Sequence, residues 1–319
     1  MFDVRKVYNE LLKFGIDVKR DGKPRREVIG WHGIDVVPDL NVPLIKGLGF
    51  YPPLAVANVI DIVEGRNPGS VPIFHKTHAK FLGPNGKFAH TYGERIANAR
   101  EPMEQLAFVK AELEHDPHST RAVATIWDGR ADCYVPVHKP CTIGFHFMID
   151  PTRGLTLFRW MRSQDLLTGF LYDCFESGFL HQLVAGWLGV GLGNFHMYTD
   201  SMHYYVDPKD SYGPAEAHDI LRDGVRQDFG ASGYHWRYNH DSWREEWKAL
   251  LAVETLVVKH GRDVPLDDCE HLLQCIRSDG YRDMGLALVA AKAPAVLTRL
   301  KFTGPFRFWT PEDWGAKRF

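Results

Sequence analysis

The sequence predicts an α+β fold in which a mixed or antiparallel sheet is packed by helices. Three observations predict it. The first part of the chain has helical periodicity, residues 121–161 change to β-branched and aromatic alternation, and a long apolar helix follows at about residues 172–188. Helices followed by paired strands and then a buried helix are typical of α+β domains.

Three helices are expected in the N-terminal third. Asp3 is a suitable N-cap, and the apolar spacing that follows it continues to Gly15, a residue type that often ends helices. Residues 54–64 are largely apolar, which indicates a buried helix, and residues 102–115 are amphipathic.

Strands are expected in the centre of the chain. Three segments there are rich in β-branched and aromatic residues: 121–127, 142–149 and 155–161. The intervening turn at 150–154 (AspProThrArgGly) predicts a hairpin between the last two. A further strand is expected at 194–199, and helices are expected at 242–260 and 265–278.

Composition is that of a soluble globular protein, with 45% hydrophobic residues, 24% charged residues and a net charge of -2. The absence of a basic excess argues against nucleic acid and membrane surfaces as partners. No segment approaches the ~18–20 apolar residues of a membrane span, and the N-terminus lacks a signal-peptide core. We therefore expect a cytoplasmic protein.

Five cysteines without CxxC spacing predict neither a disulfide framework nor a zinc site. The chain also lacks Pro-rich linkers. We expect a single catalytic domain over residues 1–319, with a helical C-terminal region at about 240–319.

Cys141 is the first candidate for chemistry. Taken alone, a cysteine is more often a small buried hydrophobic residue. However, Pro140 places this one at the start of a strand, and the hairpin can bring Arg162 beside it from the end of the next strand. A neighbouring guanidinium lowers a thiol pKa, and Arg162 with Ser163 can also hold a phosphate.

Several motifs occur in a characteristic order. They are ThrTyrGlyGlu (91–94), AspProHisSerThrArg (116–121), ProCys (140–141), ArgSerGlnAspLeuLeuThrGly (162–169) and PheHisMetTyr (195–198). As a set, over residues 50–205, they resemble the thymidylate synthase and pyrimidine nucleotide hydroxymethylase superfamily. The last hundred residues show no such resemblance.

The resemblance implies a fold, a reaction and partners. The fold is thymidylate synthase-like, with sheets that pair across a homodimer. Cys141 attacks C6 of a pyrimidine nucleoside monophosphate, and C5 then attacks the methylene carbon of 5,10-methylenetetrahydrofolate, a folate co-substrate.

The resemblance also implies roles for individual side chains. Arg162 and Ser163 bind the 5'-phosphate, and Arg121 reaches the phosphate of the neighbouring subunit. His196 and Tyr198 would bind the sugar 3'-hydroxyl, and Tyr92 would take part in proton transfer near C5. The folate would be bound by Asp165, Gly169 and Tyr172.

Each of these residues also has a structural alternative. Arg162 can form a surface ion pair, Asp165 can cap the helix that begins near Leu167, and His196 and Tyr198 can be satisfied core residues. The other histidines, including His75 and His78, have no spacing that gathers three ligands, so no metal is expected.

Asp173 departs from the superfamily pattern and indicates the substrate. Uridylate-methylating members carry Asn at this place, because a carboxamide matches O4 and N3–H of uracil. A carboxylate cannot donate to O4, but it accepts from the N4 amino group of cytosine, and if protonated it also donates to N3. The sequence therefore predicts a cytosine base, although Asp173 can also be an acid favoured by the helix dipole.

Other departures concern the catalytic machinery. Asn58 stands where relatives carry a catalytic Glu, and Asp61 or Glu64 can substitute only if the register slips. Thr120, Thr142 and Met161 replace an Arg, a His and a Gln of the pattern. These differences indicate a divergent member, for example in antibiotic biosynthesis or phage nucleotide modification.

The function expected is 5-hydroxymethylation of CMP or dCMP by a folate-dependent transferase. The alternatives are thymidylate synthase-type methylation of dUMP or UMP, and an inactive nucleotide-binding relative. The sequence leaves ribose and deoxyribose open. Glu176 is a candidate for facing the sugar or the folate, with a solvated position as its alternative, and the aromatic tail at 303–314 is a candidate for closing over the folate.

Overall fold

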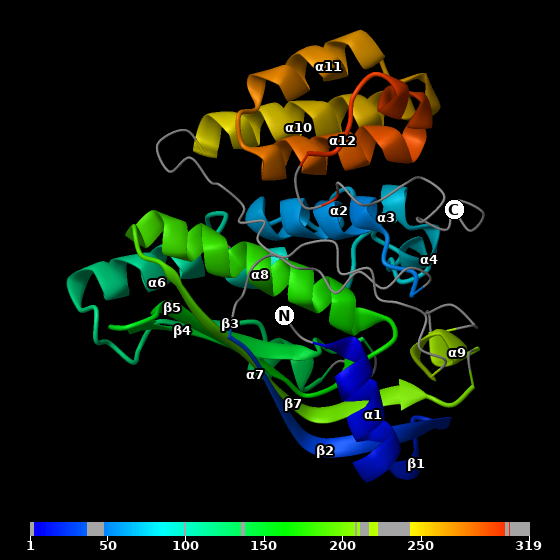
Figure 1. Cartoon of the computed structure of the whole chain (residues 1–319), viewed down its shortest axis with the longest axis vertical. Coiled ribbons are helices and arrows are strands. Elements are labelled where there is room, and N and C mark those ends of the chain that lie inside the picture. The colour runs from blue at the N-terminus through cyan, green and yellow to red at the C-terminus, as the bar shows by residue number, and fades with distance from the viewer. Residues whose placement is uncertain are drawn as a thin grey trace.

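The computed structural model describes residues 3–36, 48–98, 100–134, 138–207, 209–210, 217–222, 243–303 and 306. These residues form the α+β fold that the sequence predicts, with one mixed sheet packed by helices (Figure 1). No helix in these ranges is long and apolar enough to cross a membrane.

The sheet has the strand order β1-β2-β7-β5-β4-β3, and β6 pairs with β7 beside this path. Neighbours are antiparallel except that β5 and β6 run parallel to β7. The strands are β1 (Ile16–Arg20), β2 (Lys23–Asp35), β3 (Val123–Thr125), β4 (Thr142–Asp150), β5 (Gly154–Met161), β6 (Gln164–Asp165) and β7 (Leu192–Tyr205).

The helices connect and cover these strands. They are α1 (Val4–Phe14), α2 (Pro52–Val63), α3 (Val71–Phe74), α4 (Lys76–Ala79), α5 (Tyr92–Ile96), α6 (Glu104–His115), α7 (Gly129–Asp132), α8 (Gly169–Leu188), α9 (Ala217–Arg222), α10 (Trp243–His260), α11 (Leu266–Cys275) and α12 (Asp279–Lys292). Two short 3-10 turns, Gly261–Asp263 and Pro294–Thr298, lie near the C-terminal end.

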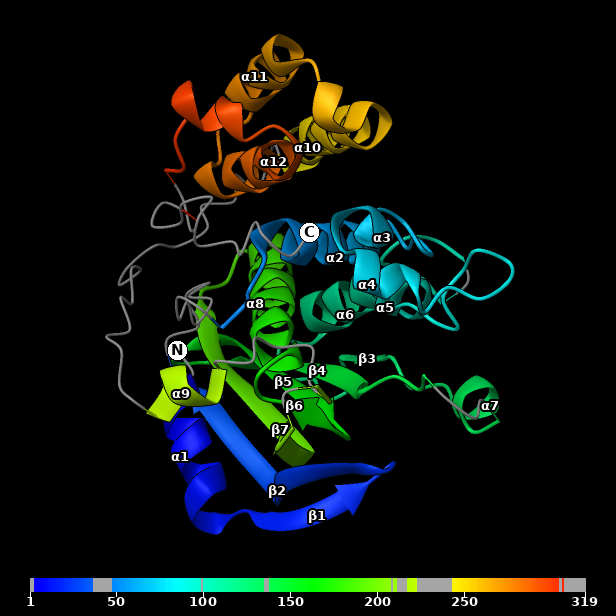
Figure 2. The ribbon, with the colours of Figure 1, turned by 90° about the vertical axis from the view of Figure 1, so that its right-hand side faces the viewer.

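The elements stack in layers above one face of the sheet. Helix α8 lies along that face, α2 lies beyond α8, and α10 to α12 form a further layer against α2 (Figures 1 and 2). Most of α8 is buried, as its apolar sequence predicts, because it is covered on both sides. We call the face of the sheet that carries α8 the inner face and the opposite one the outer face.

The hairpin predicted at 150–154 is present, since Asp150 pairs with Gly154 at the β4–β5 turn. The strand expected at 121–127 is shorter, and the strand expected at 194–199 extends over all of β7.

The sequence did not indicate β1, β2 or α12. The hydrophobic pattern does not predict strand β2, because two of the buried residues on its inner face, Arg25 and Glu27, are charged. Their opposite charges form an ion pair at 2.8 Å. Of the expected C-terminal tail, only Thr303 and Phe306 fall within the described residues, and Phe306 is buried with its ring stacked on Phe175 of α8.

Candidate active site

Cys141 and Arg162 meet across the β4–β5 hairpin. Arg162 donates its backbone N–H to the Cys141 carbonyl at 2.9 Å, and its Nη2 lies 3.9 Å from Sγ. The guanidinium is also fixed by the carbonyls of Pro140 and Lys139, at 2.8 and 2.9 Å. Ser163 follows at a partly buried position between β5 and β6.

Charges of both signs surround Cys141 and shift the pKa of its thiol in opposite directions. Burial raises the pKa of its thiol, and Asp173 and Asp165 raise it further, whereas Arg162 and Arg159 lower it. The two guanidiniums thus offset part of the desolvation of the thiolate. A group that brings more positive charge or hydrogen-bond donors to this place favours the thiolate.

Arg159 lies at the centre of the polar cluster behind Cys141. Its side chain is fully buried on the inner face of β5. It donates to Thr142 Oγ1 from Nε at 3.2 Å and from Nη2 at 2.7 Å, and to the Asp173 carbonyl and Ser177 Oγ from Nη1, at 2.7 and 2.8 Å. Nη2 also forms an ion pair with the Asp173 carboxylate.

Asp173 and Glu176 extend this cluster along α8. Glu176 Oε2 lies 3.8 Å from Arg159 Nη2, and the Asn58 side chain of α2 hydrogen-bonds to the Glu176 carboxyl. Burial, with the Asp173 charge added, raises the pKa of Glu176 to about 8. The structure therefore brings Asn58 and Asp173 into one network, which Arg159 and Glu176 complete.

Tyr92 reaches the same cluster from the start of α5. Its hydroxyl accepts a hydrogen bond from the Thr142 N–H at 3.3 Å, and its ring centroid lies 5.9 Å from Arg159 Cζ. Burial raises the pKa of Tyr92, and the Asp173 charge raises it further, so the phenol is neutral at physiological pH.

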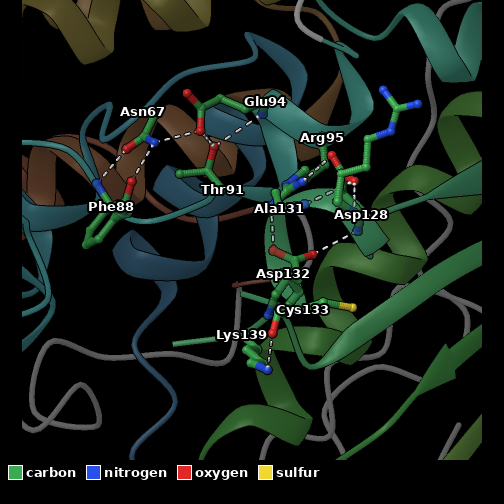
Figure 3. Close-up of polar contacts among 12 residues, drawn as sticks. Asn67, Phe88, Thr91, Glu94, Arg95, Asp128, Ala131, Asp132, Cys133 and Lys139 are labelled. Carbon is green, nitrogen blue, oxygen red and sulfur yellow. Dashed lines mark hydrogen bonds and ion pairs between the residues drawn. The ribbon is translucent and has the colours of Figure 1, made fainter. Parts of the chain in front are cut away.

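Polar contacts around α5, the helix that begins with Tyr92, fix this helix to its neighbours (Figure 3). Thr91 caps the helix by accepting from Glu94 N–H at 3.2 Å, and Asn67 Nδ2 donates to the Glu94 carboxylate at 2.6 Å. Arg95 forms an ion pair with buried Asp132 at 2.6 Å, which fixes α7 against α5.

The three residues assigned to folate lie at or before the start of α8. Asp165 Oδ1 accepts from Leu167 N–H at 3.0 Å, so it orders the turn before the helix. A Cβ on Gly169 would lie 3.1 Å from Gln164 Nε2 and 3.4 Å from Asp173 Oδ2. The Tyr172 hydroxyl accepts from Tyr51 N–H at 3.0 Å and donates to the Gly49 carbonyl at 3.4 Å.

His196 and Tyr198 lie on the outer face of the sheet, opposite Arg159. Tyr198 stacks on His32 with ring centroids 4.1 Å apart, and His196 stacks on Phe158 at 4.7 Å. The structure does not bring these two side chains together with Cys141. Their neighbours show the reason, since Phe158 and Arg159 are consecutive on β5 and therefore point to opposite faces.

The same His-x-Tyr spacing recurs seven residues later on the inner face. His203 pairs with Asp165 across β6 and β7, and its Nε2 has no hydrogen-bond partner in the described part of the chain. Burial lowers the pKa of His203 to about 4. Burial raises the pKa of Tyr205, whose neighbours include Asp165, Cys141 and Arg25, and Arg25 hydrogen-bonds to its side chain.

Arg121 lies between α6 and β3, away from this cluster. Its side chain is 68% exposed and bonded to Glu112 Oε1 from Nε at 2.8 Å and Nη2 at 2.7 Å.

No three His, Cys, Asp or Glu side chains gather closely enough to hold a metal ion in the described ranges. His75 and His78 approach each other, with their Nδ1 atoms 2.9 Å apart, but no third ligand joins them there.

Sequence reasoning missed Arg159, and a signal for it was present. Alternation along 155–161 places Arg159 with Leu155, Leu157 and Met161 on one strand face, and a charged residue there indicates a buried ion pair.

The comparison with known proteins agrees with this geometry. The thymidylate synthase family model matches residues 68–218, a range that includes Cys141, Arg162 and Asp173. Residues 68–218 are therefore similar to a thymidylate synthase domain. The hydroxymethylase relationship also holds, because the chain is 30% identical over 198 residues to the deoxyuridylate hydroxymethyltransferase of Bacillus phage SP01.

Archaeal relatives agree with this assignment. Putative thymidylate synthases of Methanocaldococcus jannaschii and Methanothermobacter marburgensis are 29% identical over 134 residues and 26% identical over 224 residues. The alignments cover 58%, 39% and 69% of this chain for the phage, Methanocaldococcus and Methanothermobacter proteins. The chain spans 51%, 59% and 93% of the respective relatives.

Proposed function

We propose that the protein is a folate-dependent 5-hydroxymethyltransferase that acts on CMP or dCMP. One observation carries the choice of base: the ion pair with buried Arg159 holds the Asp173 carboxylate as a hydrogen-bond acceptor. An acceptor suits the N4 amino group of cytosine and repels O4 of uracil. The whole chain's activity, substrate and partners are part of this proposal.

In the proposed reaction the Cys141 thiolate adds to C6 of the base, and C5 becomes nucleophilic. Arg162 and Ser163 bind the 5'-phosphate, and Arg162 and Arg159 are the positive charges that favour the thiolate. Tyr92, a buried neutral phenol beside Thr142, relays the proton that leaves C5. Asn58 orders the polar groups on the same side of the base.

In this proposal His203 and Tyr205 bind the sugar hydroxyl. They take the role that the sequence analysis gave to His196 and Tyr198. The inner-face pair lies beside Asp165 and has Cys141 as an electrostatic neighbour, and His203 offers an unpartnered Nε2.

The start of α8 fits a folate. Gly169 leaves room between Gln164 and Asp173 that a side chain would fill. Asp165 and Gly169 would hold the co-substrate there, with Tyr172 packing behind them through its bonds to residues 49 and 51. When bound, 5,10-methylenetetrahydrofolate supplies the one-carbon unit. Asn58 and Asp173 are both partly exposed, and water that reaches them would favour a hydroxymethyl product.

Tritium release tests the reaction. Given methylenetetrahydrofolate and [5-³H]CMP or [5-³H]dCMP, the protein is expected to release tritium to water, because C5 exchanges its proton during substitution. Cys141→Ala is expected to lose the release entirely. Release from dUMP alone, with none from either cytidylate, would contradict the cytidylate proposal.

Asp173→Asn tests the base. We expect the preference for cytidylate over uridylate, measured as a ratio of kcat/KM, to fall by about tenfold or more, because Asn offers a donor to O4. Ser177→Ala, which removes another Arg159 partner without changing Asp173, is the matched control and keeps the preference. An unchanged preference in Asp173→Asn would remove Asp173 from base recognition.

Hydroxymethylation of deoxyuridylate is the second candidate, and the name of the phage relative favours it. It predicts the opposite order of substrates in the tritium assay.

We also infer a homodimer that pairs the outer faces of two sheets. That face exposes Ile34, Tyr198 and Trp160, at 48%, 40% and 53%, beside the ring stack of His32, His196 and Phe158. An apolar face of this kind is typical of an interface.

Sedimentation equilibrium tests this inference. Twice the 36.4 kDa chain mass is expected for the wild type, and Tyr198→Glu is expected to shift it to the monomer, because burying a charge opposes pairing. A wild-type monomer at micromolar concentration would contradict the homodimer.

A further inference from the structure

Glu176 is a buried carboxyl that the proposed reaction has not used. It is 6% exposed and lies one turn after Asp173, on the same side of α8. Asn58 hydrogen-bonds to it, yet its Oε2 has no hydrogen-bond partner among the described residues. Buried polar atoms are nearly always partnered, so an open oxygen here points to a ligand group.

The charges around Arg159 determine the protonation of Glu176. Arg159 forms its ion pair with Asp173, and its remaining N–H groups go to Thr142, Ser177 and the Asp173 carbonyl. A second buried carboxylate would have to share the single positive charge of Arg159 with Asp173, and Arg159 Nη2, 3.8 Å from Glu176 Oε2, donates no hydrogen bond to it. Glu176 therefore carries a proton, in agreement with the burial that raises its pKa to about 8.

Two residues of this cluster are partly exposed to solvent. Asn58 is the one residue of α2 that is not buried, and the Asp173 side chain is 14% exposed. Both residues contact the Arg159–Glu176 group, so an entering base can approach it.

We propose that Asp173 and Glu176 read the base as a pair, with Asp173 accepting from the N4 amino group of cytosine and Glu176 donating to N3. Cytosine presents a donor at N4 and an acceptor at the adjacent N3, and the pair offers the complementary acceptor and donor. Asn58 acts as the positioning residue that orients Glu176. This inference rests on the proposed cytidylate substrate and adds a second recognition residue to it.

The test measures nucleotide affinity instead of turnover. Isothermal titration calorimetry of CMP and dCMP uses the full chain with Cys141→Ala, which removes the titrating thiol. Affinity is expected to fall about tenfold from pH 7 to pH 9, because one pH unit above a pKa of about 8 leaves ~10% of Glu176 protonated. The nucleotide phosphate does not interfere, since its second pKa is about 6.

Glu176→Gln in the same background keeps the donor and cannot ionise. We expect its affinity at pH 7 to stay within about threefold of the parent and to vary less than twofold up to pH 9. Glu176→Met, similar in length but without a donor, is expected to bind about tenfold more weakly at pH 7, because N3 is left unpaired. Urea unfolding checks that both variants fold.

Asp61→Asn is the matched control. The charged and polar groups that face Glu176 are Asp173 from its own helix, Arg159 from β5 and uncharged Asn58 from α2. Asp61 is on α2 as well, and burial raises its pKa to about 7, but its carboxylate accepts from Ser70 and Val71 N–H at 3.1 and 3.2 Å. Asp61→Asn is expected to keep the tenfold fall.

The outcomes separate this inference from the proposed function. An equal fall with pH in the parent and in Glu176→Gln overturns the role of Glu176, whether or not wild-type protein turns over cytidylates. The expected pH pattern without tritium release from any nucleotide supports the base reader and overturns the reaction. No cytidylate binding by the Cys141→Ala chain overturns both.

Discussion

The buried guanidinium of Arg159 is the interaction on which the site depends. From one strand it joins β4, through Thr142, to the start of α8, through Asp173 and Ser177. Its planar fork of N–H donors suits several acceptors at once. Removing one partner of a buried ion pair typically costs about 3–5 kcal/mol, so the arrangement of Cys141, Asp173 and Glu176 depends on this one side chain.

Local patterns in the sequence were sufficient for much of the frame. The alternating strands and the turn at 150–154 define the hairpin, and the hairpin alone places Arg162 beside Cys141. The apolar sequences of α2 and α8 indicate buried helices because they have no polar face.

Contacts between elements that are distant in the sequence could not be predicted from such local patterns. The bond from Asn58 to Glu176 depends on how α2 and α8 are rotated against each other, which neither sequence specifies alone. His196–Tyr198 and His203–Tyr205 have the same spacing, and only the strand register decides which pair faces inward. Strand β2 could not be predicted from apolar alternation, because two of its inner residues are charged and are buried as an ion pair.

The proposed chemistry depends on which helices carry the carboxyl groups, because Asn58 stands where the superfamily pattern has a Glu. Helix α2 carries the amide of Asn58, and α8 carries the two acids, Asp173 and Glu176. Arg159 forms its ion pair with Asp173 and lies 3.8 Å from Glu176. In the proposed reaction, the part of the chain that matches the family model, residues 68–218, provides the nucleophile and the phosphate-binding residues, and this inner cluster selects the base.

Covalent trapping tests the central claim most directly. A 5-fluorinated cytidylate cannot lose fluorine from C5 as a cation, so a reaction that begins with addition of Cys141 to C6 stops as a stable adduct. With methylenetetrahydrofolate present, peptide mass spectrometry is expected to find the 5-fluorocytidylate on the peptide that contains Cys141. An unmodified Cys141 peptide with 5-fluorocytidylate, together with an adduct of 5-fluorodeoxyuridylate, would contradict the account.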